Sequence, residues 1–116
     1  MLVLVINPGS TPTKIPLYGP EGERRTLSLS HEPRELAGFA TVADQLPYRR
    51  GLIVEALRRE AWLPAAGDAA PGGPEPPAAV MGRGGLLHPL SGGVYRVNAD
   101  MKQDLLRARY GSHASN

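Results

Sequence analysis

The sequence contains no cysteine, so a disulfide framework, a thiolate zinc site and a cysteine nucleophile are all excluded. This absence also makes a reducing cytoplasm the expected location of the protein. Long hydrophobic runs are missing as well. The apolar opening Met1–Ile6 stops at Asn7, far short of the ~18 apolar residues of a membrane helix and without the basic start and cleavage site of a signal peptide. We therefore expect a cytoplasmic protein with no membrane partner.

A large excess of one charge is also absent. The formal net charge is only +2, and acidic residues separate the arginines along the chain. A nucleic-acid groove needs a concentrated basic surface that displaces counterions, so no nucleic-acid partner is expected. We interpret the paired arginines as solvent-facing: Arg24-Arg25, Arg49-Arg50 and Arg58-Arg59.

Glycine and proline, by contrast, are abundant, with 14 glycines and 12 prolines among 116 residues. Both residue types favour turns over the interiors of helices and strands. Short elements joined by many loops are therefore expected, within one small domain. The stretch 64–77 holds five of the prolines and three of the glycines and is predicted to be a loop insertion.

Three strands joined by tight turns are predicted near the start of the chain. Leu2–Ile6 is a continuous apolar run, typical of a central strand buried on both faces. Lys14–Tyr18 and Thr26–Ser30 alternate apolar and polar residues, as a half-buried strand does. Together they predict a β-meander. Pro16 has no N–H for a ladder, so the second strand is expected to lie at an edge there or to carry a bulge.

Helical and strand patterns alternate in the rest of the chain, which predicts an α/β fold. Pro33–Ala40 is typical of a short helix. Tyr48–Trp62 is typical of a longer one whose apolar stripe packs on the sheet. A short strand is expected at Ala78–Met81 and a last helix after the N-cap Asn98. The remaining expectations are a hairpin of Leu86–Leu90 and Val94–Val97 around Ser91-Gly92-Gly93, and a helix end at Gly111.

The segment from Asn7 to Lys14 leaves an apolar strand and turns at once into the next. Its backbone amides, the Ser10 hydroxyl and the Lys14 ammonium suit a phosphate group, and the Asn7 amide can hold a ligand or a metal-bound water. It is not a Walker A loop, because the glycine before the lysine and the Ser or Thr after it are missing. An ordinary hairpin turn rich in Asn, Pro, Gly and Ser also explains the composition.

Two further segments carry candidate functional residues. Arg83 stands among glycines directly after a predicted strand, where a guanidinium can grip a carboxylate or phosphate; a glycine turn with a solvent-facing arginine is the alternative. His113 lies in a polar cluster and can donate to a transferring phosphoryl oxygen, the alternative being a frayed tail. His31 and His88 have no partners at metal-ligand spacing, so no role is assigned to them.

Four stretches, taken together, resemble the butyrate kinase family, which groups with acetate kinases among the acetokinases. They are V-I-N-P-G-S-T-P-T-K-I at the start, D-Q-L-P-Y-R-R in the middle, M-G-R-G-G-L-L-H-P-L-S-G-G-V-Y-R-V-N after the loop and G-S-H-A-S-N at the end. The resemblance covers nearly the whole chain in matching order. Only the 64–77 loop looks foreign to it.

The resemblance implies an incomplete ribonuclease-H-like, actin-like α/β domain, with residues 1–116 as a partial N-terminal acetokinase-type domain. It implies a kinase of fatty acid metabolism that transfers a phosphoryl group from ATP, with Mg²⁺, to the short-chain carboxylate butyrate. Asn7, Ser10 and Lys14 would line the phosphate side, with Asn7 near the magnesium. Arg83 would hold the carboxylate or phosphoryl group, and His113 would stabilise that group in transfer.

Two departures from the family pattern qualify these expectations. Pro12 stands where the family's N-P-G-S-T-S-T-K motif has a serine, which removes a hydroxyl and a backbone donor from the turn. Family members are two-domain proteins that can form homo-oligomers, whereas this sequence stops within H-A-S-N. We therefore expect the isolated chain to be inactive and to be marginally stable or to associate. A non-catalytic phosphate- or nucleotide-binding module is the alternative function.

Overall fold

The computed structural model describes residues 1–63 and 76–116, so the predicted loop insertion at 64–77 lies outside the described residues apart from its last two prolines. The strands are β1 (Val3–Pro8), β2 (Pro12–Gly19), β3 (Gly22–Ser30) and β4 (Ala79–Gly82). The helices are α1 (Pro33–Leu36), the 3-10 turn η1 (Ala43–Gln45), α2 (Leu46–Arg59) and α3 (Ala99–Leu106).

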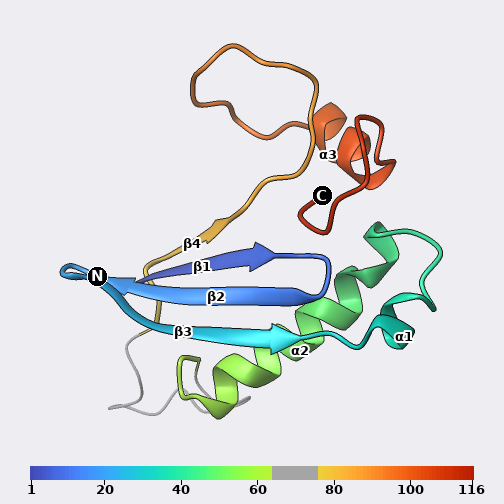
Figure 1. Ribbon diagram of the computed structural model, residues 1–116. Coiled ribbons are helices and arrows are strands. Elements are labelled where there is room, and N and C mark those ends of the chain that lie inside the picture. The colour runs from blue at the N-terminus through green and yellow to red at the C-terminus, as the bar shows by residue number, and fades with distance from the viewer. Residues whose placement is uncertain (64–75) are drawn as a thin grey trace.

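One mixed sheet, with its strands in the order β3-β2-β1-β4, organises the chain (Figure 1). β1, β2 and β3 form an antiparallel meander, and β4 then pairs in parallel with β1, placing Gly82 opposite Ile6. The α/β class, the meander and the interior position of β1 are thereby confirmed.

Pro16 lies inside the sheet, because β2 pairs with β1 on one side and with β3 on the other. The predicted edge position is therefore wrong. The alternative prediction was a bulge at Pro16, and the register of β2 against β3 does shift nearby, between Leu17 and Tyr18. The irregularity begins one residue after Pro16, which has no N–H to donate.

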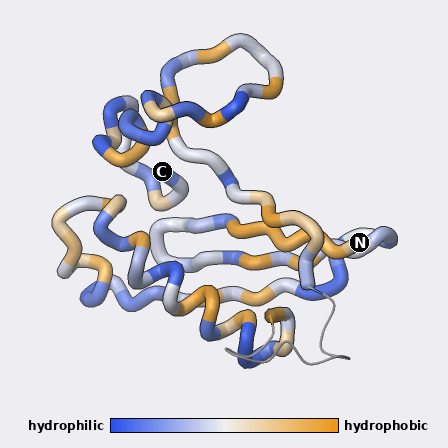
Figure 2. The backbone as a smooth tube through the Cα atoms, turned by 180° about the vertical axis from the view of Figure 1, so that it is seen from behind, coloured by the Kyte–Doolittle hydropathy of each residue, from blue (hydrophilic) through white to orange (hydrophobic). Residues whose placement is uncertain are grey.

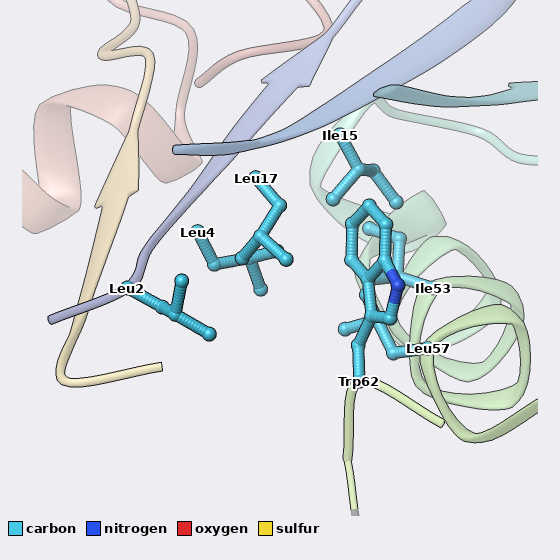
Figure 3. Close-up of a cluster of buried hydrophobic side chains, with 7 residues drawn as sticks. All are labelled: Leu2, Leu4, Ile15, Leu17, Ile53, Leu57 and Trp62. Atoms are coloured by element: carbon cyan, nitrogen blue, oxygen red, sulfur yellow. The ribbon is translucent and has the colours of Figure 1, made fainter. Parts of the chain in front are cut away.

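The hydrophobic core lies between one face of the sheet and α2. Figure 3 shows Leu4, Ile15 and Leu17 from the strands meeting Ile53 and Leu57 from the helix. Each such buried side chain stabilises the fold by ~1.5–3 kcal/mol. Leu2 and Trp62 complete the cluster.

The other face of β1 is less covered than the sequence predicts. Val3 and Val5, which alternate with Leu4, are only partly buried. The prediction that Leu2–Ile6 is buried on both faces is wrong, because α2 packs against one face only. The second face is left for the polar side chains described below.

The helices of the first half confirm the predicted pattern with shifted ends. α1 begins at Pro33 as expected but stops at Leu36, short of Ala40. α2 begins at Leu46, and its stripe includes the buried Ile53 and Leu57. After α2 the chain reverses, and the Trp62 N–H donates to the Leu57 carbonyl at 2.8 Å. This reversal places the indole in the core (Figure 3).

The predicted hairpin of Leu86–Leu90 and Val94–Val97 is wrong, since this segment contains no strand. Figure 2 shows hydrophobic residues in a loop that stands apart from the sheet. Val94 is 102% exposed and Val97 is 60% exposed. A two-stranded ribbon is marginal without a surface to pack on, and Pro89 cannot donate to a ladder. The alternating residues therefore have no layer to bury them.

α3 confirms the predicted cap. The Asn98 side-chain oxygen accepts a hydrogen bond from the Met101 N–H at 2.9 Å. The helix ends at Leu106, earlier than the predicted Gly111, and Ala108 follows with a φ of 49°. Across residues 1–63 and 76–116 there is no helix of sufficient length and apolarity for a membrane span.

Candidate functional site

Asn7, Lys14 and Arg83 line one hollow of about 530 Å³ on the face of the sheet opposite α2. Strand pairing explains their meeting. Asn7 of β1 is the cross-strand partner of Lys14 of β2. On the other side of β1, the N–H of Arg83 donates to the Ile6 carbonyl at 3.0 Å. The hollow thus reaches the carboxyl ends of the parallel strands β1 and β4, where open α/β sheets usually bind ligands.

The charges of the hollow are separated along the strands. Its carboxylate, Glu23, accepts hydrogen bonds from the Thr26 hydroxyl at 2.8 Å and the Tyr18 hydroxyl at 3.3 Å. This end of the hollow lies four residues from Lys14 along β2. The exposed Lys14 and Arg83 leave the Asn7 end positive. An ammonium, a guanidinium and an amide are suitable groups for binding a phosphate or carboxylate.

The turn between β1 and β2 is held from within the protein by Arg49 of α2. Its Nη1 donates to the Gly9 carbonyl at 3.1 Å and its Nη2 to the Ser10 carbonyl at 3.2 Å. Arg49 is only 7% exposed, so the interpretation of this residue as solvent-facing is wrong. It lies one helical turn before Ile53, on the stripe that faces the sheet, and this spacing was the signal for its burial.

Ser10 lies exposed at the tip of the turn and is not among the described residues that line the hollow. The Gly9 N–H donates to the Pro12 carbonyl at 2.7 Å, so the turn itself uses this amide. A Cβ at position 9 would lie 2.8 Å from the same carbonyl oxygen, which explains the glycine. The turn therefore offers a ligand fewer backbone donors than the sequence suggested.

Thr13 and His31 form a buried pair beneath the turn, which sequence reasoning missed. The Thr13 hydroxyl lies 2.7 Å from Nε2 of His31, and the two residues are 0% and 3% exposed. Burial, followed by the charge of Arg49, lowers the pKa of His31, against a smaller opposing effect of Glu35. Thr13 alternates with the buried Ile15, and this pattern was the signal for its position. No local pattern predicted the position of His31.

His113 does not join Arg83 in the hollow, among the side chains that the structure describes. Its Nδ1 instead lies 2.7 Å from the Ser115 hydroxyl. Ser115 in turn donates to the Gly84 carbonyl at 3.0 Å, and the Asn116 side-chain oxygen accepts from the Leu86 N–H at 3.3 Å. The H-A-S-N segment is therefore held against the glycine segment that follows β4 rather than frayed.

A second cavity, of about 510 Å³, lies on the α2 side of the sheet. Its lining is mainly apolar, from Leu4 and Val80 of the strands to Ile53 of α2 and Leu105 of α3. Of its two arginines, Arg49 already donates to the turn carbonyls and Arg50 is exposed, and the rest of the lining offers few groups for an anion. The candidate site is therefore the polar hollow on the opposite face.

Comparison with known proteins identifies relatives over the whole chain, although no family model matches it. The probable butyrate kinase of Bacteroides thetaiotaomicron is 42% identical over 116 residues, covering 100% of this chain and 30% of that protein. The probable butyrate kinase of Enterococcus faecalis is 40% identical over 114 residues, 98% of this chain and 28% of that protein. Butyrate kinase 1 of Clostridium acetobutylicum is 40% identical over 114 residues, 98% of this chain and 29% of that protein. The chain is homologous to an N-terminal portion of butyrate kinases.

The resemblance to the butyrate kinase family is thereby confirmed, and the chain spans about 30% of the length of the first of these relatives. Of the site residues that the resemblance implied, the structure brings only three together. Asn7, Lys14 and Arg83 share the hollow, Ser10 lies at the turn tip, and His113 lies apart.

The hollow suits a phosphate group better than a metal ion on its own. Among the residues described, no cluster of three or more His, Cys, Asp or Glu side chains can hold a metal. Magnesium, however, is commonly bound through substrate phosphates and water with few protein ligands. The Asn7 amide oxygen is a neutral oxygen donor of the kind that such an ion or its water accepts.

Proposed function

We propose that this chain supplies the phosphoryl-binding side of a butyrate kinase-type phosphotransferase with an actin-like fold. In the reaction, a carboxylate oxygen of butyrate forms a bond to the γ-phosphorus of ATP while the bond from that phosphorus to the ADP oxygen breaks. The products are butyryl phosphate and ADP. Such a transfer depends on positioning and charge neutralisation more than on covalent chemistry.

The observation that carries this proposal is the meeting of Asn7, Lys14 and Arg83 around one hollow. Lys14 would neutralise phosphate oxygens as a compact charge. Arg83 would bind the carboxylate or the transferring group through two parallel N–H bonds. The names of the relatives, which match over the whole chain, support butyrate as the acceptor. The mixed sheet is compatible with the actin-like fold.

Magnesium would enter this site with the nucleotide phosphates. When bound, the ion supplies charge neutralisation on the phosphate oxygens. Asn7 is the residue of this chain that would hold it, directly or through one water. The remaining contacts of this chain to the phosphates are left to Lys14 and Arg83.

The test of the proposal is binding of MgATP and of inorganic phosphate to this chain, measured by isothermal titration. Lys14→Ala is expected to weaken both by about 10- to 100-fold, the loss of one charge-assisted contact. Lys102→Ala is a matched control, because Lys102 is an exposed lysine on α3, outside the hollow. Failure of the wild-type chain to bind either ligand at millimolar concentration would overturn the proposal.

A second variant tests whether Arg83 takes part in binding the phosphate. Arg83→Ala should also weaken phosphate binding, whereas Arg96→Ala removes an exposed arginine outside the hollow and should leave it unchanged. Equal losses in the two arginine variants would show that net charge, rather than the hollow, drives binding.

The alternative function is a phosphate- or nucleotide-binding module without catalysis. It is favoured by Pro12, whose carbonyl takes up the Gly9 N–H and which offers neither hydroxyl nor N–H itself. Hydroxylamine trapping of butyryl phosphate is the measurement that can exclude this alternative. We expect MgATP binding without turnover by this chain alone, and turnover by this chain would exclude the non-catalytic module.

A further inference from the structure

Arg49 contacts the turn in a way that orients two peptide groups. Its guanidinium donates to two consecutive carbonyls, those of Gly9 and Ser10, at 3.1 and 3.2 Å. Each carbonyl shares a planar trans peptide unit with the N–H of the next residue, and the two groups point in opposite directions. Because the Gly9 and Ser10 carbonyls face inward to Arg49, the N–H groups of Ser10 and Thr11 face outward.

The outward N–H groups are available to a ligand. In the described part of the chain neither the Ser10 N–H nor the Thr11 N–H has a hydrogen-bond partner. By contrast, the Gly9 N–H is taken by Pro12. Consecutive backbone N–H groups that converge on one side of a turn are a known way of binding anions.

A buried network holds Arg49 in place. Its Nε donates to Gln45 Oε1 at 3.0 Å, and its Nη1 also donates to Thr13 Oγ1 at 3.3 Å. No carboxylate of the described residues forms an ion pair with Arg49, so its charge is balanced by these oxygens and the turn carbonyls. A buried guanidinium with this many fixed partners has little freedom to move.

The Thr13 hydroxyl links Arg49 to His31. Since Thr13 Oγ1 accepts from Arg49, its one proton is free to donate to Nε2 of His31 at 2.7 Å. This assignment makes His31 neutral with the proton on Nδ1, which is buried without a partner among the described residues. The backbone N–H of His31 donates to the Thr11 carbonyl at 2.8 Å, so His31 also restrains the turn.

We propose that Arg49, Thr13 and His31 form a positioning cluster that aims the Ser10 and Thr11 N–H groups at a phosphate oxygen beside Lys14. This inference rests on the proposed function, because it takes a phosphoryl group as the ligand of the turn. It adds two backbone donors and three positioning residues to the side chains of the hollow.

The protonation state of His31 affects the positioning cluster. Protonation of Nε2 would turn it into a second donor toward Thr13 Oγ1 and would place a cation beside Arg49. The other groups that face His31 are Glu35 of α1 and the Tyr48 ring of α2, whose hydroxyl donates to Glu35 at 2.6 Å. Glu35 favours the protonated form but is outweighed by burial and Arg49.

Amide NMR spectra of this chain, titrated with inorganic phosphate, test the cluster directly. The Ser10 and Thr11 amide signals should shift as phosphate is added until the site is saturated. In Lys14→Ala the same shifts should need a higher phosphate concentration. If phosphate binds in a Lys14-dependent manner and these two amides stay unchanged, the inference is overturned while the proposed function stands. If phosphate does not bind to the wild-type chain at all, the proposed function itself has failed.

Variants separate positioning from folding. Arg49→Lys keeps the charge but lacks the planar guanidinium that holds both carbonyls together with Gln45 and Thr13, and it should weaken phosphate binding by about tenfold. Arg50→Lys is the matched control on the exposed neighbour and should bind phosphate like the wild type. Equal affinities in Arg49→Lys and the wild type would contradict the proposal.

Thr13 provides the test that remains if Arg49→Lys does not fold. Thr13→Val preserves the side-chain shape and removes the hydroxyl, so it should weaken phosphate binding, and Thr13→Ser should restore it.

The pH dependence of phosphate affinity gives a second test, of His31. Phosphate affinity of the wild type should fall more steeply below pH 6.5 than that of His31→Asn, once the protonation of phosphate is corrected for. Identical profiles would exclude a role for His31.

Discussion

Residues 1–63 and residues 76–116 differ sharply in how they are held. All the buried hydrophobic side chains of the described structure belong to the first region, from Leu2 to Trp62. In the second region no residue is buried, and Val94 is fully exposed. The second region is attached to the first through the β4–β1 pairing, and the hydrogen bonds of its last residues run within the second region itself. Backbone and polar contacts therefore position the second region, whereas packing positions the first.

The candidate site spans this boundary. Asn7 and Lys14 stand on strands of the packed region, and Arg83 follows the short β4 strand of the other. Local unfolding is expected where few apolar contacts oppose it. When the second region unfolds locally, we expect Arg83 to leave the hollow first. The turn between β1 and β2 should keep its conformation.

The largest effect is expected in the core. Leu57, 3% exposed, packs in the cluster between α2 and the sheet, and Leu57→Ala should lower the free energy of unfolding by ~2–5 kcal/mol through lost burial and a cavity. Leu90→Ala makes the same chemical change at a residue that is 49% exposed and should cost far less. Urea denaturation monitored by Trp62 fluorescence measures both. Equal losses would remove the distinction between the two regions.

A glycine of the second region should give a smaller, local effect. A Cβ on Gly85 would lie 2.5 Å from the Asn116 Cα, so Gly85→Ala should displace the H-A-S-N segment at a cost of ~1–3 kcal/mol. Gly84→Ala is the control, because a Cβ there meets nothing within 4 Å. Hydrogen exchange of the amides after Gly111 reports the displacement. Protection that is unchanged in Gly85→Ala would contradict this contact.

The α3 cap comes next. Asn98→Ala removes the side-chain acceptor of the Met101 N–H and should destabilise α3 by ~0.5–2 kcal/mol. Because this helix contributes no buried residue, the loss should appear as fraying of α3 rather than as global unfolding. Carbon-13 chemical shifts along α3 and the urea midpoint measure the two separately. A midpoint shift as large as that of Leu57→Ala would show that the regions fold as one unit.

The smallest effect concerns pH. The pKa of His31 is lowered in the folded state by burial and Arg49, so the unfolded chain binds more protons below about pH 6.5. The stability due to neutral His31 is therefore complete above pH 6.5 and declines as the pH falls below it. His31→Asn should flatten this part of the stability profile, whereas His88→Asn should not. A flat wild-type profile between pH 5 and 7 would argue against the buried neutral state.

Elements with a strong local pattern were predictable. The β1–β3 meander follows from alternation and turn residues, and the stripe of α2 follows from helical spacing. The Asn98 cap follows from a side chain that can satisfy its own helix. The predicted hairpin at 86–97 was wrong because its alternating residues have no layer to pack against. Alternation predicts a strand only where a neighbouring layer buries one face, and none does so here.

The candidate site was half predictable. Asn7 and Lys14 lie on adjacent strands joined by a short turn, so the sequence alone brought them together. Arg83 reaches them only because β4 pairs with β1 in parallel, a contact across more than 70 residues of sequence. His113 was placed with Arg83 by resemblance, but the described structure holds its ring against Ser115 instead.

The sequence by itself determined the elements whose forces act between near neighbours: the meander, the amphipathic α2, the capped α3 and the family resemblance. Only the tertiary structure decided which charged groups are buried and which meet. Arg49 and His31 look like surface residues in the sequence, since burial of a polar group becomes affordable only when distant partners satisfy it. Those partners are the turn carbonyls and Thr13, which come within reach only when α2 packs on the folded sheet.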